Sequence, residues 1–267
     1  MALLTLLTDF GLADYYVAAV KGTVLRLAPG SQIVDLGHGV PPGDVEAGSF
    51  LLAAAVPAFP AGAVHLAVVD PGVGSRRRIL AARLAGSPPS WLVAPDNGLL
   101  TGLLPAVDSV REVARTDLFL AGPGETFHGR DRFAPLAAAL LAGEPPAVLG
   151  PEIADPVRLA APPPRRTAGA LHGRIVHVDR FGNLVTDIPA AWLPAAPCRV
   201  EVGSGSLHTA LHRVSHYAEI PPGEAAYLAG SLGTVEISLN GADLAVRWSA
   251  GRGDAVRITW SAPVQSV

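Results

Sequence analysis

Seven prolines between Pro145 and Arg166 limit how this 267-residue chain can fold more than any other feature of its sequence. Proline fixes its backbone φ angle and has no N–H to donate, so neither a helix nor a central strand can run through such a stretch. We therefore predict a connector over residues 145–166, with one domain over residues 1–160 and a second over residues 168–267.

Short apolar runs alternate with segments of helical periodicity before this connector. The runs Leu3–Leu7, Gln32–Leu36 and Val64–Val69 predict strands, and the third is almost all aliphatic, as in a strand covered on both faces. The segments between them predict helices, one capped by Asp14 and one over residues 44–55. This alternation is typical of an α/β domain with a mostly parallel sheet.

After the connector the pattern changes to short runs of β-branched and aromatic residues separated by Gly, Pro and Asn. Such runs predict a smaller all-β, barrel-like domain of about 100 residues. The predicted strands are Gly173–Val178, Leu184–Ile188, Arg199–Val202, Thr234–Leu239, Leu244–Trp248 and Ala255–Trp260.

The composition of the chain excludes some classes of binding partner. The formal net charge of -3 gives no field that attracts nucleic acid or an anionic membrane. The single cysteine, Cys198, excludes an internal disulfide and favours a reducing compartment. The first apolar run meets Asp9 too early for a signal peptide, and no stretch approaches the roughly 18 apolar residues of a membrane span. We expect a cytoplasmic protein without nucleic-acid or membrane partners.

Two predicted strands end in carboxylates. Asp70 follows the strand Val64–Val69, and Asp9 follows the first strand. Strand ends in α/β sheets open into the ligand-binding crevice, although a turn role is the alternative for Asp9. Arginines follow Asp70 at positions 76, 77 and 78. Such a run is most often solvated, but one arginine held beside Asp70 would keep that carboxylate ionised and supply directed donors.

His128 stands just before Asp131, which is placed to cap a helix over Phe133–Leu141. Taken alone, a histidine in this position is more often a hydrogen-bonded structural residue than a catalyst. The sequences DFG at 9–11 and HGRD at 128–131 partly match protein-kinase motifs. In kinases the catalytic loop precedes DFG, and a glycine-rich loop with a lysine precedes both, so the order excludes a kinase.

A second histidine group consists of His208, His212 and His216. Spacing by four residues places them on one face of either a helix or a strand, where they could bind a metal. No acidic or cysteine ligand completes the set, so we expect a solvated face and no metal site.

Seven motifs occur in a fixed order along nearly the whole chain. They are TDFG, DVEAGSFLL, HLAVVDPGVGSRRR, APDNGLL, TFHGRDRFAPLAA, HVDRFGNLVTDI and GSLGTVEISLNGADLA. Together they resemble the S-adenosyl-L-methionine (SAM) hydroxide adenosyltransferase family, also called SAM hydrolases, which is related to fluorinase and chlorinase enzymes. The resemblance implies an N-terminal α/β domain, a C-terminal β-barrel-like domain, and a homotrimer with active sites between one subunit's N-terminal domain and a neighbour's C-terminal domain.

The same resemblance implies hydrolysis of SAM to adenosine and L-methionine, by attack of activated water on C5′ of the ribose, without a cofactor. It assigns the catalytic roles to Asp70, Arg77 and His128. Because three arginines are adjacent, the position of the catalytic arginine is open by one residue.

Substrate binding is also implied by the resemblance. Asp9 matches the carboxylate that accepts the ribose hydroxyls, and Asn240 lies where the adenine is held. Asp179, Asn183 and Ser231 match residues that bind the amino-acid end of methionine. Leu232 departs from the halogenating relatives, which carry an arginine after that serine.

The chemistry of a sulfonium suits this set of residues. Its leaving group is a neutral thioether that needs no general acid, so the barrier lies mostly in aligning and activating a weak nucleophile. Two alternatives stay open, a SAM-dependent halogenase of the same fold and a SAM- or adenosine-binding sensor without turnover. An intact set of Asp70, Arg77 and His128 favours turnover of SAM with water.

Overall fold

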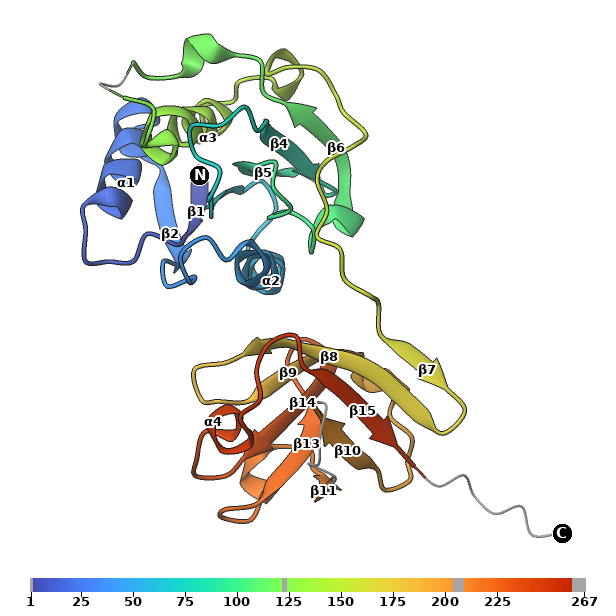
Figure 1. Ribbon diagram of the computed structural model, residues 1–267. Helices are drawn as coiled ribbons and strands as arrows, with labels where there is room; N and C mark the ends of the chain where they lie inside the picture. The colour runs from blue at the N-terminus through green and yellow to red at the C-terminus, as the bar shows by residue number, and fades with distance from the viewer. Residues whose placement is uncertain (1, 122–123, 204–208, 261–267) are drawn as a thin grey trace, which may run out of the picture. The chain divides into compact units, whose positions relative to one another are not determined.

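The computed structural model describes residues 2–121, 124–203 and 209–260, which form two compact units, Met1–Ala160 and Ala161–Val267 (Figure 1). The first is an α/β unit and the second is rich in strands. The fold class predicted from the sequence is confirmed by these two architectures.

A six-stranded sheet in the order β2-β1-β3-β5-β4-β6 organises the first unit. Strands β2, β1, β3 and β5 pair in parallel, whereas β4 is antiparallel to both of its neighbours. The strands are β1 Leu3–Thr8, β2 Gln32–Gly37, β3 Val64–Val68, β4 Ile79–Leu84, β5 Ser90–Pro95 and β6 Val107–Glu112.

Helices cover both faces of this sheet. The helices are α1 Tyr16–Leu27, α2 Val45–Ala55 and α3 Ala134–Leu141. Helices α1 and α3 pack together on one face, and α2 lies on the other (Figure 1). Because successive strand residues point to opposite faces, Leu6 packs in the core with α1 and α3, whereas Leu7 packs in the core with α2. Burial from both sides accounts for the aliphatic composition of β3.

Two predicted helix caps are wrong. Helix α1 begins at Tyr16, and no side chain caps it, so Asp14 is not its cap. Asp131 lies inside a π-helical turn, Gly129–Phe133, and its carboxylate accepts hydrogen bonds from Arg130 Nε at 2.6 Å and Nη2 at 2.8 Å. This turn runs directly into α3, so Asp131 stands within helical backbone and not at the start of the helix.

Asp44 is the side chain that caps α2, and it gives a stability prediction. Its Oδ1 accepts a hydrogen bond from the backbone N–H of Ala47 at 3.0 Å. Asp44→Ala leaves that donor without its partner and should lower the free energy of unfolding by about 1 kcal/mol, whereas Asp44→Asn should lower it by much less. Urea denaturation followed by the helical circular-dichroism signal measures both. Equal stabilities for wild type and Asp44→Ala would show that the cap contributes nothing.

The second unit is a curled, mostly antiparallel sheet of nine strands. Strand β8 turns the sheet, because its first half pairs with β7 and β15 and its second half with β9. Only the β12–β13 pair is parallel among the described pairings. The strands are β7 Arg165–Thr167, β8 Ala170–Val178, β9 Leu184–Pro189, β10 Arg199–Val202, β11 Thr209–Ala210, β12 His212–Arg213, β13 Ala225–Ala229, β14 Thr234–Leu239 and β15 Ala255–Thr259.

The strand predicted over Leu244–Trp248 is wrong, because this segment forms the short helix α4. The Asp243 side chain accepts a hydrogen bond from Val246 N at 2.8 Å at the start of α4, and Ser249 ends the helix in the left-handed conformation. Leu244 is fully buried while Val246 is 76% exposed. A strand would place these two side chains on the same face, so the helix explains their different burial.

The proline-rich segment packs along the first unit for much of its length. Ile153 N donates to Val110 O at 2.8 Å, and Leu159 N donates to Thr101 Oγ1 at 2.9 Å. The segment contains the 3₁₀ turn Pro146–Val148 and the first residues of β7. The first compact unit therefore extends to Ala160.

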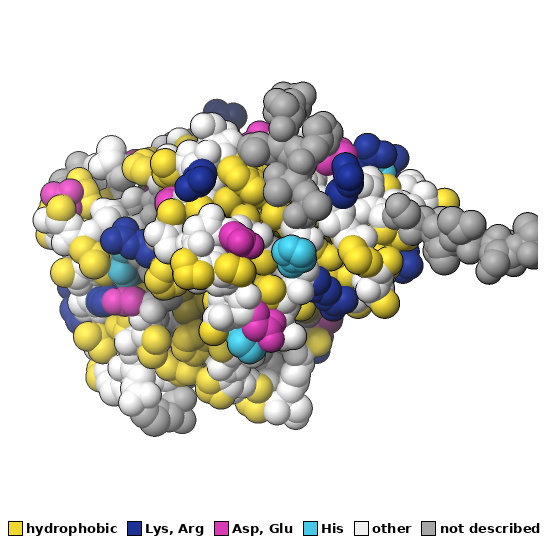
Figure 2. Space-filling model, turned by 90° about the horizontal axis from the view of Figure 1, so that it is seen from below, with side chains coloured by type: hydrophobic (Ala, Val, Ile, Leu, Met, Phe, Trp, Pro, Cys, Tyr) yellow, Lys and Arg dark blue, Asp and Glu magenta, His cyan; other side chains and the backbone are white. Residues whose placement is uncertain are grey.

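The molecular surface shown in Figure 2 has basic and acidic side chains interspersed, with hydrophobic side chains between them. On this face neither sign of charge is gathered into one field. Among the described residues, no helix is both long enough and apolar enough to cross a membrane.

Candidate active site

Asp9 and Asp70 both line one pocket, at the point where the sheet changes its direction of winding. From β1 the chain leads through α1 to β2 on one side, and β3 then pairs with β1 on the other side. Asp9 and Asp70 follow the carboxyl ends of β1 and β3, so they lie at the switch point where open α/β sheets bind ligands. A pocket of about 270 Å³ opens there, lined by Asp9, Phe10, Tyr15, Tyr16, Val68, Asp70, Val73, Thr126, Phe127, His128 and Gly129.

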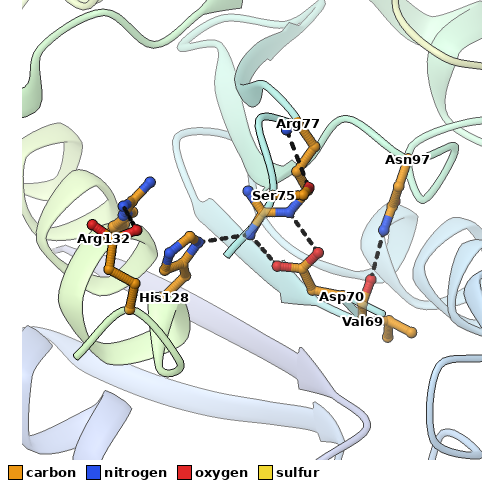
Figure 3. A network of polar contacts seen from close by, with 8 residues as sticks. Val69, Asp70, Ser75, Arg77, Asn97, His128 and Arg132 are labelled. Atoms are coloured by element: carbon orange, nitrogen blue, oxygen red, sulfur yellow. Dashed lines mark hydrogen bonds and ion pairs between the residues drawn. The ribbon is translucent and has the colours of Figure 1, made fainter. Parts of the chain in front are cut away.

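Asp70, Arg77 and His128 form one hydrogen-bonded set beside this pocket (Figure 3). Arg77 grips Asp70 with two donors, Nε to Oδ1 at 2.5 Å and Nη2 to Oδ2. The same Nη2 lies 3.0 Å from His128 Nδ1. Both members of the ion pair are buried, with side chains 8% and 4% exposed for Arg77 and Asp70. A buried charge pair with two matched hydrogen bonds holds its geometry, because separating the charges would leave both desolvated.

His128 is held as a neutral imidazole with a defined tautomer. Burial lowers its pKa, and the charges of Arg132 and Arg77 lower that pKa further, against the opposing effect of Asp70. A guanidinium nitrogen can only donate, so Nδ1 of His128 accepts from Arg77 and the ring proton resides on Nε2.

Two buried donors of this set have no protein acceptor. Within the described part of the chain, neither His128 Nε2 nor Arg77 Nη1 has a hydrogen-bond partner. Leaving a buried donor unsatisfied is costly, so such groups call for an explanation, and an absent ligand or water supplies one. The set therefore offers N–H donors to a bound ligand or water.

The local backbone geometry gives the three adjacent arginines different contacts. Between β3 and β4 the chain makes tight turns, with Val73 N donating to Asp70 O at 3.1 Å and Ser75 N to Gly72 O at 3.0 Å. Arg77 is thereby turned back toward Asp70. Arg78 instead pairs with Asp96 and Asp155, and Arg76 is exposed. Arg77 is thus the arginine of the run that contacts Asp70.

His128 and Asp9 are each fixed by a close backbone approach. The π-helical turn that follows His128 brings Gly129 against Phe10, and a Cβ at position 129 would lie 3.2 Å from the Phe10 ring. Asp9 Oδ2 accepts a hydrogen bond from Gly43 N at 2.8 Å, which ties the end of β1 to the loop before α2.

A second pocket, of about 560 Å³, lies in the C-terminal unit and contains three of the predicted binding residues. Asp179 Oδ1 accepts from the backbone N–H groups of Phe181 and Asn183, and its Oδ2 accepts from Asn183 Nδ2 at 2.8 Å. Asn240 donates from Nδ2 to Ile220 O at 2.6 Å. Ser231 is exposed in the turn between β13 and β14 and is not among the residues that line this pocket.

Sequence reasoning missed the aromatic wall of the first pocket and part of the second. Phe10, Tyr16 and Phe127 pack with tilted and edge-to-face ring contacts around the first pocket. Phe10 follows Asp9 and Phe127 precedes His128 in the sequence, and this adjacency is the signal that could have found those two residues. Tyr217 and Ser238 also line the second pocket. Ser238 lies in the motif GSLGTVEISLNGADLA but received no role, and Tyr217 lies outside the seven motifs.

His212 and His216 do not share one face of a helix or strand, as their spacing had predicted. His208 lies outside the described residues. His212 is in β12, whereas His216 precedes a 3₁₀ turn and lies 3.5 Å from Glu219. No cluster of three or more His, Cys, Asp or Glu side chains suited to a metal ion occurs in the part of the chain that the structure describes.

Two family models match the chain, the SAM hydroxide adenosyltransferase N-terminal domain over residues 4–150 and the corresponding C-terminal domain over residues 173–257. The chain belongs to the SAM hydroxide adenosyltransferase family. This membership confirms the resemblance carried by the seven motifs.

Relatives of known name agree with the family. A protein named (R)-S-adenosyl-L-methionine hydrolase from Salinispora tropica is 41% identical over 257 residues, covering 94% of this chain and 95% of that protein. One of the same name from Thermus thermophilus is 42% identical over 245 residues, covering 88% and 90%. The fluorinases that match are 28–30% identical. The chain is thus more similar to these hydrolases than to these halogenating relatives.

The family fold is also found in a solved structure. The crystal structure of an uncharacterized conserved protein from Thermotoga maritima matches with a TM-score of 0.88 and 33% identity, covering 96% of this chain and all of that one.

Proposed function

We propose that this chain hydrolyses S-adenosyl-L-methionine to adenosine and L-methionine, with water attacking C5′ of the ribose. The observation that carries the proposal is the buried Asp70–Arg77–His128 set with its two donors that have no protein acceptor. Membership of the SAM hydroxide adenosyltransferase family and about 40% identity to named SAM hydrolases support it.

In this mechanism the set binds and orients the attacking water. Asp70 and His128 both line the pocket, and Asp70 accepts a hydrogen bond and then a proton from the water. Arg77 holds both partners in place through its contacts with Asp70 and His128. The sulfur leaves as a neutral thioether, so alignment of the water supplies most of the catalysis and the reaction needs no cofactor.

The remaining predicted residues bind the substrate. We assign the ribose hydroxyls to Asp9, the amino-acid end of methionine to Asp179, Asn183 and Ser231, and the adenine region to Asn240. These residues belong to two separate units, and we propose that a homotrimer joins the N-terminal unit of one subunit to the C-terminal unit of its neighbour. We further propose a cytoplasmic location and no nucleic-acid partner, in keeping with the single cysteine and the small net charge.

Water is a better nucleophile than a halide for this site. An ionised Asp70 next to the nucleophile repels fluoride or chloride but accepts a hydrogen bond from water. At a few ångströms in a partly buried site, that repulsion is on the order of several kcal/mol. Arg77 offsets part of it, because its guanidinium is paired with the Asp70 carboxylate.

Incubation with SAM in water enriched in oxygen-18 tests the proposal. We expect adenosine labelled at the 5′ oxygen, together with unlabelled L-methionine, without added halide, because water supplies the oxygen of the new C5′–O bond. Chromatography with mass spectrometry identifies both products. A 5′-halo-5′-deoxyadenosine as the main product in salt, or adenosine without the label, would contradict hydrolysis by this route.

A further inference from the structure

One face of β14 carries a polar ladder that the proposed catalytic steps do not use. Val235 and Ile237 point into the core of the C-terminal unit, so Glu236 and Ser238 share the opposite face of the strand. Ser238 and Asn240 line the second pocket, the one in this C-terminal unit. Glu236 lies at the start of this ladder.

Glu236 is a buried carboxylate with two hydroxyl partners. It is 6% exposed, and its Oε1 accepts hydrogen bonds from Tyr217 Oη at 2.6 Å and Ser238 Oγ at 3.1 Å. Gly230 makes room for its other oxygen, because a Cβ at position 230 would lie 2.9 Å from Oε2. Two hydrogen bonds to one buried oxygen atom hold both hydroxyl partners in place.

These two hydrogen bonds leave both hydroxyl groups able only to accept hydrogen bonds from a ligand. Tyr217 and Ser238 each have a single hydroxyl hydrogen, and both hydrogens are donated to Glu236. Burial and the contact with Glu236 raise the pKa of Tyr217, so its hydroxyl keeps its proton. Toward the pocket, both oxygens therefore present lone pairs only.

The charged residues around this pocket also favour ligand groups that donate hydrogen bonds. Asp179 lines it, and neither Lys nor Arg is among the described residues of its wall. Acceptor oxygens and a carboxylate disfavour carbonyl and carboxylate groups of a ligand, and they favour N–H groups.

We propose that Glu236 is a positioning residue that fixes Tyr217 and Ser238 as acceptors, so that this pocket selects substrates carrying an amino group. The inference rests on the proposed function for the identity of the substrate. S-adenosyl-L-methionine has two such groups, the exocyclic amine of adenine and the α-ammonium of the methionine part, and they share the same donor chemistry.

The test compares wild type, Glu236→Leu and Tyr217→Phe on three substrates: SAM, the analogue with hypoxanthine in place of adenine, and the analogue without the α-amino group. In wild type, one analogue should have kcat/KM at least about tenfold below that of SAM, and this identifies the amine that is recognised. Both variants should raise KM for SAM by roughly tenfold, keep kcat, and lose most of that discrimination. Leucine accepts no hydrogen bond, so the hydroxyl hydrogens of Tyr217 and Ser238 are free to donate elsewhere, while phenylalanine keeps the ring and lacks the oxygen.

Glu219→Leu is the matched control, because Glu219 is an exposed carboxylate in the same 3₁₀ turn as Tyr217, and its loss should leave discrimination unchanged. Equal discrimination in wild type and in a folded Tyr217→Phe would overturn the inference. If wild type does not turn over SAM, the proposed function fails instead. Calorimetry of adenosine against inosine, and of methionine against its deamino analogue, then decides the inference by binding, and equal affinities in both pairs would overturn it.

Discussion

An Asp70→Asn variant should hydrolyse SAM at least about 100-fold more slowly than wild type. Asparagine has the shape of aspartate, but it has neither the charge that repels halide nor the basicity that takes a proton from water. The loss should appear in kcat as well as in kcat/KM, because the interaction develops as the water attacks. Steady-state rates of adenosine formation measure it.

Asp108→Asn is the matched control for this variant. Asp108 also accepts two hydrogen bonds from one arginine, Arg83 Nε at 2.8 Å and Nη2 at 2.7 Å, but it lies on β6 and not in the pocket. Its loss should leave kcat within about twofold of wild type, since exposed ion pairs contribute little.

Folding has to be measured beside activity, because breaking a buried ion pair costs about 3–5 kcal/mol of stability. Arg77→Lys provides a second variant that keeps the charge. A lysine has one ammonium group and cannot reproduce the two-pronged contact with Asp70 together with the contact to His128, so activity should fall here too. Wild-type kcat in a folded Asp70→Asn would remove Asp70 from the catalytic set.

The sequence singled out Asp70, Arg77 and His128, which contact one another in the structure, better than it located the elements that hold them. Asp9 and Asp70 were found because strand ends followed by Gly-containing turns are visible in a sequence. Which of the three arginines contacts Asp70 is not visible in the sequence, since it depends on two tight turns and on the pairing of Arg78 with Asp96 and Asp155. The residues that give the adjacent arginines different partners lie in distant parts of the chain.

Strands β4, β5 and β6 were not predicted in the first unit. They follow one another through turns without intervening helices, whereas the pattern before them alternates strand and helix. In the second unit, Leu244–Trp248 has strand-like composition, but the Asp243 cap and the exposure of Val246 belong to a helix. Glu236 lies in the motif GSLGTVEISLNGADLA but received no role, because its contact with Tyr217, 19 residues away in sequence, is visible only in the structure.

A mixture of two inactive variants tests whether the active site joins two subunits. Asp70→Asn damages the N-terminal unit and Asn183→Ala damages the C-terminal unit, and each variant alone should have little activity. In a heterologous ring assembled at random from equal amounts, about a quarter of the sites combine an intact N-terminal unit with an intact C-terminal unit from its neighbour. Activity should therefore recover to about a quarter of the wild-type level after subunit exchange.

A mixture of Asp70→Asn with His128→Ala is the matched control, because both changes lie in the N-terminal unit and no pairing restores an intact one. This mixture should stay as inactive as its components, which separates complementation from residual activity or refolding. Native mass spectrometry shows whether the two chains have exchanged. A site built within one subunit gives a different result: the Asp70→Asn and Asn183→Ala mixture would stay inactive despite proven exchange, or light scattering would find an active monomer, and either outcome excludes the shared site.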